Sequence, residues 1–297
     1  MNIQNFILLK KYNILLASNQ IYALMEPEII DGVKCYAPAL ALDNSGYHPE
    51  ALTVLSKLEN DNFWYISRNV VLKKIFKRFL GNKTSEVLEV GCGNGTVIRS
   101  LSELKNLRLT GADIYLSGVK FAKSQVPQVD FIQLDAENIP FENKFDAVGC
   151  FDVLEHIEND RRVLSQLHKA LKKDAMLFVT VPQYPWLWSE IDEIDRHKRR
   201  YTKKEMIRKT EEAGFDILHV NCFAAAVFPI TLLSRVGRKR KKEDAKITSD
   251  AVTYPEIDIP WVLNKFLRTV MLIDELFYSL GVKLPFGSSI VLVAVKR

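Results

Sequence analysis

The chain has 297 residues, of which 47% are hydrophobic and 26% are charged, and its net charge is +5. This length allows one α/β domain with additions or two small domains. The composition excludes a collagen-like, disulfide-scaffold or mostly disordered chain. A charge of +5 suits an acidic small molecule or an anionic surface and requires neither. The four cysteines stand far apart without a C-x-x-C pair, so we expect no metal site and no disulfide framework.

No segment of the sequence predicts secretion or a membrane-spanning helix. Ile7–Leu9 is followed at once by Lys10 and Lys11, and no small-residue cleavage site comes after them. The longest apolar run, residues 223–233, is far shorter than the roughly 18–20 residues that cross a bilayer. We therefore expect a cytoplasmic protein. The first 25 residues are expected to be loosely attached, with Met25 as an alternative natural start.

Hydrophobic spacing predicts two helices between residues 47 and 83, preceded by an extension over residues 1–46. The aromatic run Phe63-Trp64-Tyr65 is expected to lie between these helices, with Arg68 after it. Strands and helices then alternate, which predicts a mostly parallel sheet with helices on both faces. The expected strands are residues 86–90, 107–114, 129–134, 145–151, 175–181 and 215–223. The expected helices are residues 96–104, 116–124, 160–171 and 202–213.

The core predicted over residues 84–223 is followed by an insertion and one more strand. The insertion, residues 224–286, contains most of the apolar run, a basic stretch from Arg235 to Lys242, and a helix over residues 260–280. The last strand lies within residues 287–297. An apolar segment beside lysines and arginines is compatible with contact with an anionic membrane at its inner face. The alternative is an amphipathic cover for the sheet edge followed by a solvated loop.

A glycine-rich turn directly follows the first predicted strand of the core. The sequence runs Val87-Leu88-Glu89-Val90-Gly91-Cys92-Gly93-Asn94-Gly95-Thr96. Glycine lets the backbone turn sharply and approach a ligand without an intervening Cβ. The G-x-G-x-x-G/A fingerprint of NAD-binding folds fails, because Thr96 occupies its last position. The spacing is instead G-x-G-x-G, preceded by the acid Glu89.

This turn resembles motif I of the class I methyltransferases that depend on S-adenosylmethionine (SAM). The resemblance is close over residues 86–213, and the stretch 145–157 looks like motif IV of small-molecule methyltransferases. It implies a Rossmann-like sheet of seven strands, with the helical pair as a lid and the insertion before the last strand. It also implies that Glu89 orients the turn or meets the methionine ammonium. The residues expected to bind SAM are Glu89, Gly91, Cys92, Gly93, Asn94, Gly95, Asp113, Ile114, Asp135, Ala136, Phe151, Asp152 and Arg68.

Two further acids stand at the ends of predicted strands. Asp113 ends the second strand, where a carboxylate can accept hydrogen bonds from both ribose hydroxyls. By resemblance, Asp135 accepts from the adenine amino group while the Ala136 amide donates to the ring. Each acid alone could be a solvated loop residue or a helix cap. Taken together and in order, they favour a cofactor site at the carboxyl edge of the sheet.

Two histidines are candidate catalytic bases. Methyl transfer mainly requires alignment of the acceptor, and a hydroxyl acceptor also benefits from a general base. His156 follows the fourth strand, where the alternative is a packing or capping role. His197 lies in residues 182–201, which resemble a subgroup of bacterial methyltransferases with Trp, Asp and then His-x-Arg-Arg-Tyr; Arg196 replaces the glycine expected there. The matching residues, expected to bind the acceptor unless they form an ordinary basic surface, are Trp188, Asp192, Arg199, Arg200 and Tyr201.

The resemblance implies transfer of a methyl group from SAM to a small-molecule, glycan or lipid-linked acceptor, with S-adenosylhomocysteine as product. Oxygen is favoured as the acceptor atom by analogy. Nucleic acid is not expected, because residues 151–154 lack the Pro-Pro-aromatic turn of amino-methylating DNA enzymes. The alternatives are a SAM-dependent enzyme of another reaction, since a fold does not fix chemistry, and a non-catalytic SAM-binding scaffold. The acids at the strand ends argue against the scaffold.

Overall fold

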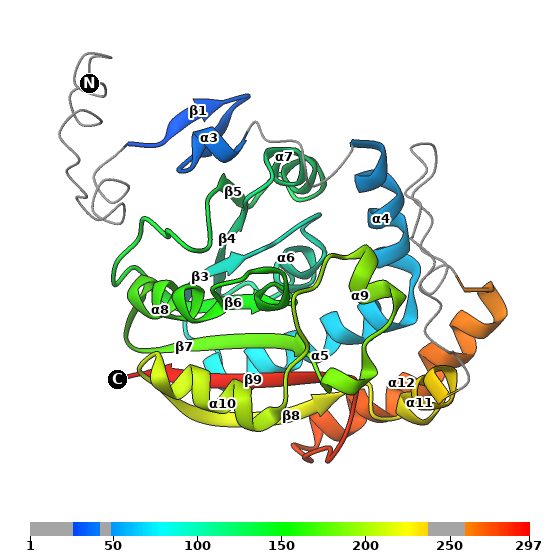
Figure 1. The fold of residues 1–297 in the computed structure, drawn as a ribbon. Coiled ribbons are helices and arrows are strands. Elements are labelled where there is room, and N and C mark those ends of the chain that lie inside the picture. Colours follow the sequence, from blue (N-terminus) through cyan, green and yellow to red (C-terminus); the bar gives the residue numbers. More distant parts are fainter. Residues whose placement is uncertain (1–25, 42–48, 237–258) are drawn as a thin grey trace.

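A computed structural model describes residues 26–41, 49–236 and 259–297 (Figure 1). The strands are β1 Glu28–Ile30, β2 Val33–Cys35, β3 Ser85–Val90, β4 Leu107–Asp113, β5 Asp130–Gln133, β6 Phe145–Phe151, β7 Leu171–Pro182, β8 Phe215–Phe223 and β9 Ser289–Lys296. The α-helices are α3 Pro38–Ala41, α4 Pro49–Asp61, α5 Phe63–Leu80, α6 Thr96–Leu101, α7 Leu116–Gln125, α8 Asp160–Ala170, α9 Glu190–Ile194, α10 Lys203–Glu212, α11 Phe228–Val236 and α12 Trp261–Ser279. Two 3-10 turns, η1 Leu154–His156 and η2 Pro185–Leu187, follow β6 and β7.

The strands form one sheet in the order β1-β2-β5-β4-β3-β6-β7-β9-β8. All neighbours from β2 to β7 pair in parallel, while β9 pairs antiparallel with both β7 and β8. The chain steps outward from β3 to β4 and β5 and then crosses back to β6. This reversal is a topological switch point, and ligands of open α/β sheets bind at the carboxyl ends of the strands there. The expected Rossmann-like architecture is confirmed.

Two apolar layers cover the sheet. Side chains of α5, α6, α7 and α12 pack on one face, with Phe76 and Ile98 in the cluster. Side chains of α8 and α10 pack on the other face, with Leu167 and Met206 in that cluster. Because successive side chains of a strand point to opposite faces, neighbouring residues of β3 belong to different layers. This packing holds the carboxyl ends of the strands at one edge (Figure 1).

The expected number of strands was wrong: in the described part of the chain the sheet has nine strands rather than seven. The two additional strands, β1 and β2, form a hairpin that extends the sheet beside β5. Asp31 and Gly32 form its two-residue turn with φ values of 49° and 75°, as a type I′ turn requires. Three-residue strands are too short to show alternation. The Asp-Gly dipeptide was the signal that could have identified them.

Helices α4 and α5 are joined to the insertion. Phe63 begins α5, so the aromatic run is part of a helix and does not lie between two helices as expected. Asn264 of α12 accepts a hydrogen bond from the Phe63 amide at 2.8 Å and donates to the Asp61 carbonyl at 2.7 Å. Buried Asp274 of α12 accepts from the amides that precede α11. Helix α12 therefore fixes the junction of α4 and α5.

Two expectations, one about the start of the chain and one about the insertion, concern residues outside the described ranges. These are the attachment of residues 1–25 and most of the basic stretch, residues 237–242. Within the described ranges, the structure contains no helix that is both long and apolar enough to cross a bilayer.

Candidate active site

Two glycines of the turn after β3 pack tightly against the protein, and the third, Gly93, faces open space. Gly91, Gly93 and Gly95 have φ values of 79°, 49° and 77°, a region that favours glycine. A Cβ on Gly91 would lie 2.2 Å from a methyl group of Val153, and one on Gly95 would lie 2.9 Å from Cβ of Ala122. In the described part of the chain, a Cβ on Gly93 would meet nothing within 4 Å. Gly93 therefore leaves room for a ligand.

Glu89 is the last residue but one of β3, close to this turn. Its side chain is 2% exposed, and its Oε2 has no hydrogen-bond partner among the residues that the structure describes. Burial raises the pKa of Glu89 to about 8, an effect that the positive charge of Arg68 opposes. Buried polar atoms are normally paired, so this oxygen fits a ligand that brings its own donor, such as the ammonium of SAM.

Asp113 links the turn to the end of β4. Its Oδ2 accepts from the Gly93 amide and its Oδ1 accepts from the Tyr115 amide, both at 2.9 Å. Each carboxylate oxygen can accept a second hydrogen bond, so ribose hydroxyls remain acceptable partners. Beyond β5, Asp135 accepts from the Glu137 amide at 2.9 Å. Both acids lie at the carboxyl edge, as predicted.

The main-chain positions predicted to contact SAM lie at the same edge. The carbonyl of Ile114 accepts from the Gln133 side chain at 3.0 Å, which ties β4 to β5. Ala136 is 8% exposed. Within the turn itself, Cys92 and Asn94 are both buried. Burial raises the pKa of the Cys92 thiol, which makes it a packing residue and not a nucleophile.

Helix α5 reaches the edge through Arg68. Its guanidinium forms a 2.8 Å ion pair with Asp152 at the end of β6 and lies 5.2 Å from the ring centres of Trp64 and Tyr65. Asp152 has a φ of 55°, and its amide donates to the Thr180 carbonyl at 3.0 Å. Strained non-glycine residues cluster at functional sites. Phe151, which precedes it, is buried against Phe76 of the core.

The sequence did not reveal one acid of the lid. Glu59 of α4 forms side-chain hydrogen bonds with Thr96 and Asn94, and burial raises its pKa while Arg68 opposes that rise. A glutamate near the end of an amphipathic helix looks like an ordinary surface residue. Only the tertiary fold shows that it contacts the glycine-rich turn.

Residues 182–201 extend from the end of β7 and are organised by Asp192. This side chain is fully buried. Its Oδ2 accepts from the Ser189 amide and hydroxyl at 2.7 and 3.1 Å, and its Oδ1 contacts His197 Nδ1 and Arg200 Nε at 2.8 Å each. Burial opposes ionisation, but the hydrogen bonds from His197 and Arg200 outweigh it and lower the pKa of Asp192 to about 2. An ionised Asp192 only accepts, so His197 Nδ1–H donates to it, and in the neutral ring the lone pair is then on Nε2.

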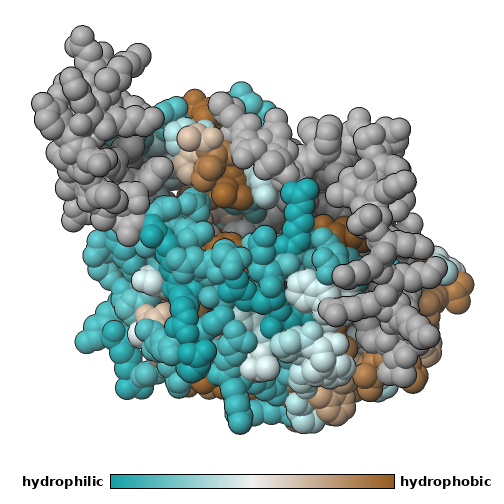
Figure 2. All heavy atoms as spheres, viewed as in Figure 1, coloured by the Kyte–Doolittle hydropathy of each residue, from teal (hydrophilic) through white to brown (hydrophobic). Residues whose placement is uncertain are grey.

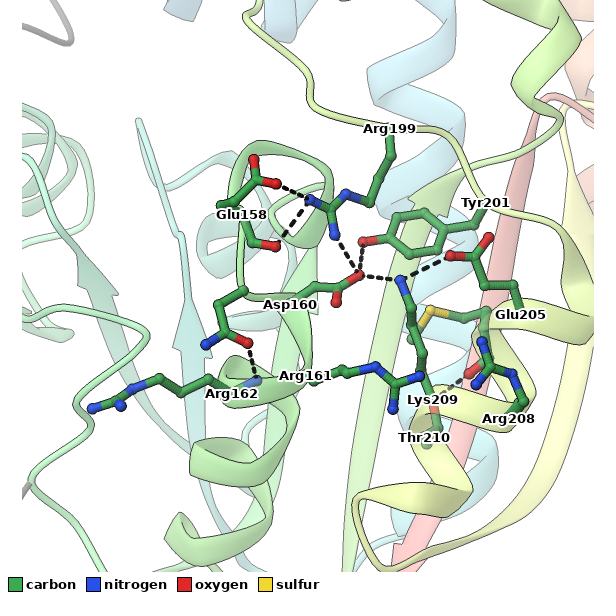
Figure 3. A network of polar contacts seen from close by, with 12 residues as sticks. Glu158, Asp160, Arg161, Arg162, Arg199, Tyr201, Glu205, Arg208, Lys209 and Thr210 are labelled. Atoms are coloured by element: carbon green, nitrogen blue, oxygen red, sulfur yellow. Dashed lines mark hydrogen bonds and ion pairs between the residues drawn. The ribbon is translucent and has the colours of Figure 1, made fainter.

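Arg199 and Tyr201 turn toward α8, where they surround Asp160 (Figure 3). The Tyr201 hydroxyl donates to Asp160 at 2.7 Å, Lys209 lies at 2.6 Å and Arg199 at 3.2 Å. Tyr201 is fully buried. Tyr201 was expected to bind the acceptor. In this structure it instead anchors the segment to α8 and α10 and does not reach an open acceptor site.

The two candidate bases lie together. The rings of His156 in η1 and His197 meet edge to face with centroids 4.6 Å apart. Loss of solvent on its protein-facing side, followed by the charge of His197, lowers the pKa of His156 to about 4. Arg196, just before His197, has a φ of 54°, which explains why similar segments have glycine there.

A model of the methyltransferase domain family matches residues 64–220, more than half of the chain. The chain belongs to the class I SAM-dependent methyltransferase family. The free Oε2 of Glu89 and the open space at Gly93 fit the cofactor of that family.

Relatives and solved structures agree with this placement. The chain is 26% identical over 135 residues to a demethylmenaquinone methyltransferase of Chlorobaculum tepidum, covering 45% of this chain and 54% of that protein. It is 24% identical over 119 residues to a ubiquinone biosynthesis O-methyltransferase of Rickettsia bellii, covering 39% and 49%. The chain thus spans about half the length of these curated relatives. Phosphoethanolamine N-methyltransferase 2 of Haemonchus contortus, solved with SAM, shares the fold with a TM-score of 0.55 at 20% identity, covering 86% and 59%.

Aromatic side chains beyond β7 form a wall that the sequence only partly indicated. Tyr184 and Trp186 lie 5.1 Å apart, and both contact Phe228 of α11. Phe286 extends this set with a centroid 5.6 Å from Phe228. Trp188, the residue singled out beforehand, donates its indole N–H to Glu193. The signal for Tyr184 and Trp186 was present in the same segment, whereas Phe228 and Phe286 come from the insertion.

Proposed function

We propose that the whole protein transfers the methyl group of SAM to an oxygen atom of a small acceptor and releases S-adenosylhomocysteine. The observation that carries this proposal is the His197–Asp192 pair beside the cofactor edge. Asp192 holds Nδ1–H, so in the neutral ring the lone pair that can activate a hydroxyl is on Nε2 of His197. A hydroxyl is a weak nucleophile until its proton is removed, which is where such a group contributes.

Residues at the cofactor edge have separate roles in this proposal. Glu89 accepts from the methionine ammonium, Asp113 from the ribose, and Asp135 from the adenine. The ion pair of Arg68 with Asp152 holds the lid against the end of β6, which limits water near the reacting methyl group. The His156 ring lies between this edge and His197, which it contacts. In this proposal, the residues at the cofactor edge align the acceptor with the methyl group, and this alignment is the main source of rate enhancement.

The acceptor that fits best is an apolar or lipid-linked molecule with a ring hydroxyl. The aromatic wall of Tyr184, Trp186 and Phe228 offers flat apolar contacts at the end of β7. The names of two relatives refer to demethylmenaquinone and to ubiquinone biosynthesis. These observations support an acceptor of this class over a glycan.

An apolar corner formed by α11 and α12 supports contact with a membrane. Figure 2 shows hydrophobic surface at the end of the molecule that these helices occupy in Figure 1. The exposed apolar side chains there are Ile230, Leu232, Leu233, Trp261, Val262, Leu263, Phe266, Leu272, Ile273, Leu276 and Leu280. Exposed Lys265, whose ammonium lies 4.0 Å from the Trp261 ring centre, adds positive charge. Apolar anchors beside lysines suit an anionic bilayer surface, from which a lipid-linked acceptor could enter.

Transfer of a labelled methyl group from SAM to a panel of hydroxylated rings and lipid-linked acceptors tests the reaction. We expect His197→Ala to lower kcat by roughly 10²–10⁴-fold with an unchanged Kd for SAM. Lys204→Ala, on the exposed side of α10, is the matched control and should keep full activity. Tight SAM binding without transfer to any hydroxyl, or full turnover by His197→Ala, would overturn the proposal.

Flotation with liposomes tests the membrane contact separately. The protein should float with phosphatidylserine vesicles and remain behind with phosphatidylcholine vesicles. Trp261→Ser combined with Phe266→Ser should abolish flotation, whereas Leu218→Ser, at an exposed apolar position of edge strand β8, should not change it. Equal flotation of all three proteins would contradict a membrane surface at this corner.

A further inference from the structure

Three potential metal ligands from two separate segments converge next to the cofactor edge. Glu155 and His156 belong to η1, directly after β6, and His197 belongs to the segment after β7. One ligand atom from each of the three side chains lies within 4.8 Å of the other two. A single ion could therefore contact all three with small side-chain adjustments.

One oxygen of the Glu155 carboxylate, Oε2, has no hydrogen-bond partner among the residues that the structure describes. Glu155 is 1% exposed. A buried carboxylate oxygen in this state is costly unless something positive meets it. The nearby cation, Arg200, directs its Nε to Asp192, while the carboxylates of Asp152 and Asp192 add negative charge around Glu155. The electrostatics of the cluster thus favour a cation.

Both imidazoles are oriented by neighbouring acceptors. Nδ1–H of His197 donates to Asp192 at 2.8 Å, and the backbone of Asp195 and of Asp152 offers hydrogen-bond acceptors to the His156 ring. Histidines that bind metals are commonly held in this way, with the far ring nitrogen donating to a carboxylate or carbonyl. Asp192 is itself fixed by Ser189 and Arg200. These contacts preorganise His197 Nε2 in particular.

We propose that Glu155, His156 and His197 bind a divalent first-row transition-metal ion beside the SAM site. One carboxylate and two imidazoles form a donor set that suits Zn²⁺, Mn²⁺, Fe²⁺ or Co²⁺. Mg²⁺ and Ca²⁺ prefer oxygen ligands alone and are expected to bind weakly. Three protein ligands leave coordination positions open for an oxygen of the acceptor.

The role of this ion rests on the proposed function. An acceptor hydroxyl that binds the ion ionises more readily, because the positive charge stabilises its conjugate base. Its proton passes to solvent. The oxygen then forms a bond to the methyl carbon of SAM while the carbon–sulfur bond breaks and its electron pair stays on sulfur. The two histidines then act by holding the ion instead of accepting the proton directly.

Direct titration of the chelator-treated full-length chain with metal ions tests the site without any acceptor. Calorimetry with Zn²⁺ and visible absorption with Co²⁺ should show one ion per chain, with little binding of Mg²⁺. Glu155→Gln, His156→Ala and His197→Ala should each weaken Zn²⁺ binding by at least about 10-fold. His168→Ala, a histidine on α8 outside the cluster, should bind as the unmodified chain does.

The three variants keep the test independent of misfolding. His156 is exposed, so His156→Ala should fold even if Glu155→Gln does not, and SAM affinity reports an intact core. Absence of a Co²⁺ spectrum and of Zn²⁺ heat in the unmodified chain would overturn the proposal. Binding that survives both His156→Ala and His197→Ala would overturn it as well.

Activity measurements separate this site from the proposed function. If the metal-free enzyme methylates a hydroxyl at full rate, the ion has no role in transfer, while O-methylation stands. If Zn²⁺ binds through the cluster but no hydroxyl is methylated with SAM bound, the metal site stands and the proposed reaction fails. If addition of Zn²⁺ restores the rate of the metal-free enzyme, both are supported.

Discussion

Two sets of buried carboxylates in this molecule differ in how completely they are paired. Asp160 and Asp192 accept hydrogen bonds or ion pairs from several side chains each. Glu89 and Glu155 are as deeply buried, yet in the described structure each has an oxygen without a partner. The first set fixes the segment after β7 to the domain. The second set lines the edge where ligands are expected.

The contrast shows why burial of an acid does not by itself indicate function. Removing a carboxylate from water is costly, and a protein recovers that cost only by pairing it fully. Where pairing is complete, the acid is part of the framework. Where one oxygen has no partner among the described residues, it can accept a hydrogen bond from a ligand. Substitutions in the two sets should therefore affect different measurements.

The largest expected effect belongs to Asp160. Asp160→Asn leaves Lys209 and Arg199 around a neutral side chain, and loss of one partner of a buried ion pair costs about 3–5 kcal/mol. Urea denaturation followed by circular dichroism measures this loss. Glu205→Gln is the matched control, because this partly exposed partner of Lys209 should cost less than ~1 kcal/mol. If Asp160→Asn lowers the free energy of unfolding by less than ~1 kcal/mol, Asp160 does not hold the segment after β7 to the domain.

Substitution of Glu89 should instead change the affinity for SAM and the number of protons released when SAM binds. Because its pKa in the free protein is raised to about 8, Glu89 is protonated at pH 6.5 and should lose this proton when the SAM ammonium arrives. Calorimetry in two buffers of different ionisation enthalpy should show release of close to one proton. Glu89→Gln should remove this release and weaken SAM by about 1.5–3 kcal/mol. Equal heats in both buffers would exclude Glu89 as the ammonium partner.

The same shift has a consequence for stability. An acid with a raised folded pKa binds more protons in the folded than in the unfolded state, so the free energy of unfolding falls as pH rises. For Glu89 this contribution is present below its ordinary pKa near 4.5 and is lost by about pH 8. The Glu89→Gln variant should lack this slope in denaturation experiments between these pH values.

The turn contains a glycine that faces open space, Gly93, and one that packs against the protein, Gly91, and the two should also differ in what their substitution changes. Gly93→Ala places a methyl group in open space, so it should lower SAM affinity by an order of magnitude or more, with a stability loss of about 1 kcal/mol from its positive φ. Gly91→Ala places its methyl group against Val153 and should lower stability more than Gly93→Ala does. Calorimetry and urea denaturation of both variants measure the two effects. If the two variants lose stability equally and Gly93→Ala binds SAM normally, Gly93 does not face the ligand.

The position of the glycine turn and of the acids at one edge of the sheet was predictable from the sequence because its signals are local. The glycine turn and the acids at strand ends occur at fixed positions in the chain, and the order of strands places them together. The segment after β7 was less predictable, since the roles of Asp192 and Tyr201 depend on contacts with distant residues. Glu155 was not singled out, because its distinctive property is the lack of a partner. That property exists only in the folded molecule.

Tyr201 gives the smallest expected effect and separates the two interpretations of its segment most directly. Its hydroxyl is one of several donors to Asp160, so Tyr201→Phe should cost about 1 kcal/mol of stability, the net value of one hydrogen bond. A framework residue should leave the Kd for SAM and the KM for the acceptor unchanged. A residue that binds the acceptor should instead raise KM when its hydroxyl is removed. A raised KM with unchanged stability would therefore show that this segment rearranges to bring Tyr201 to the acceptor.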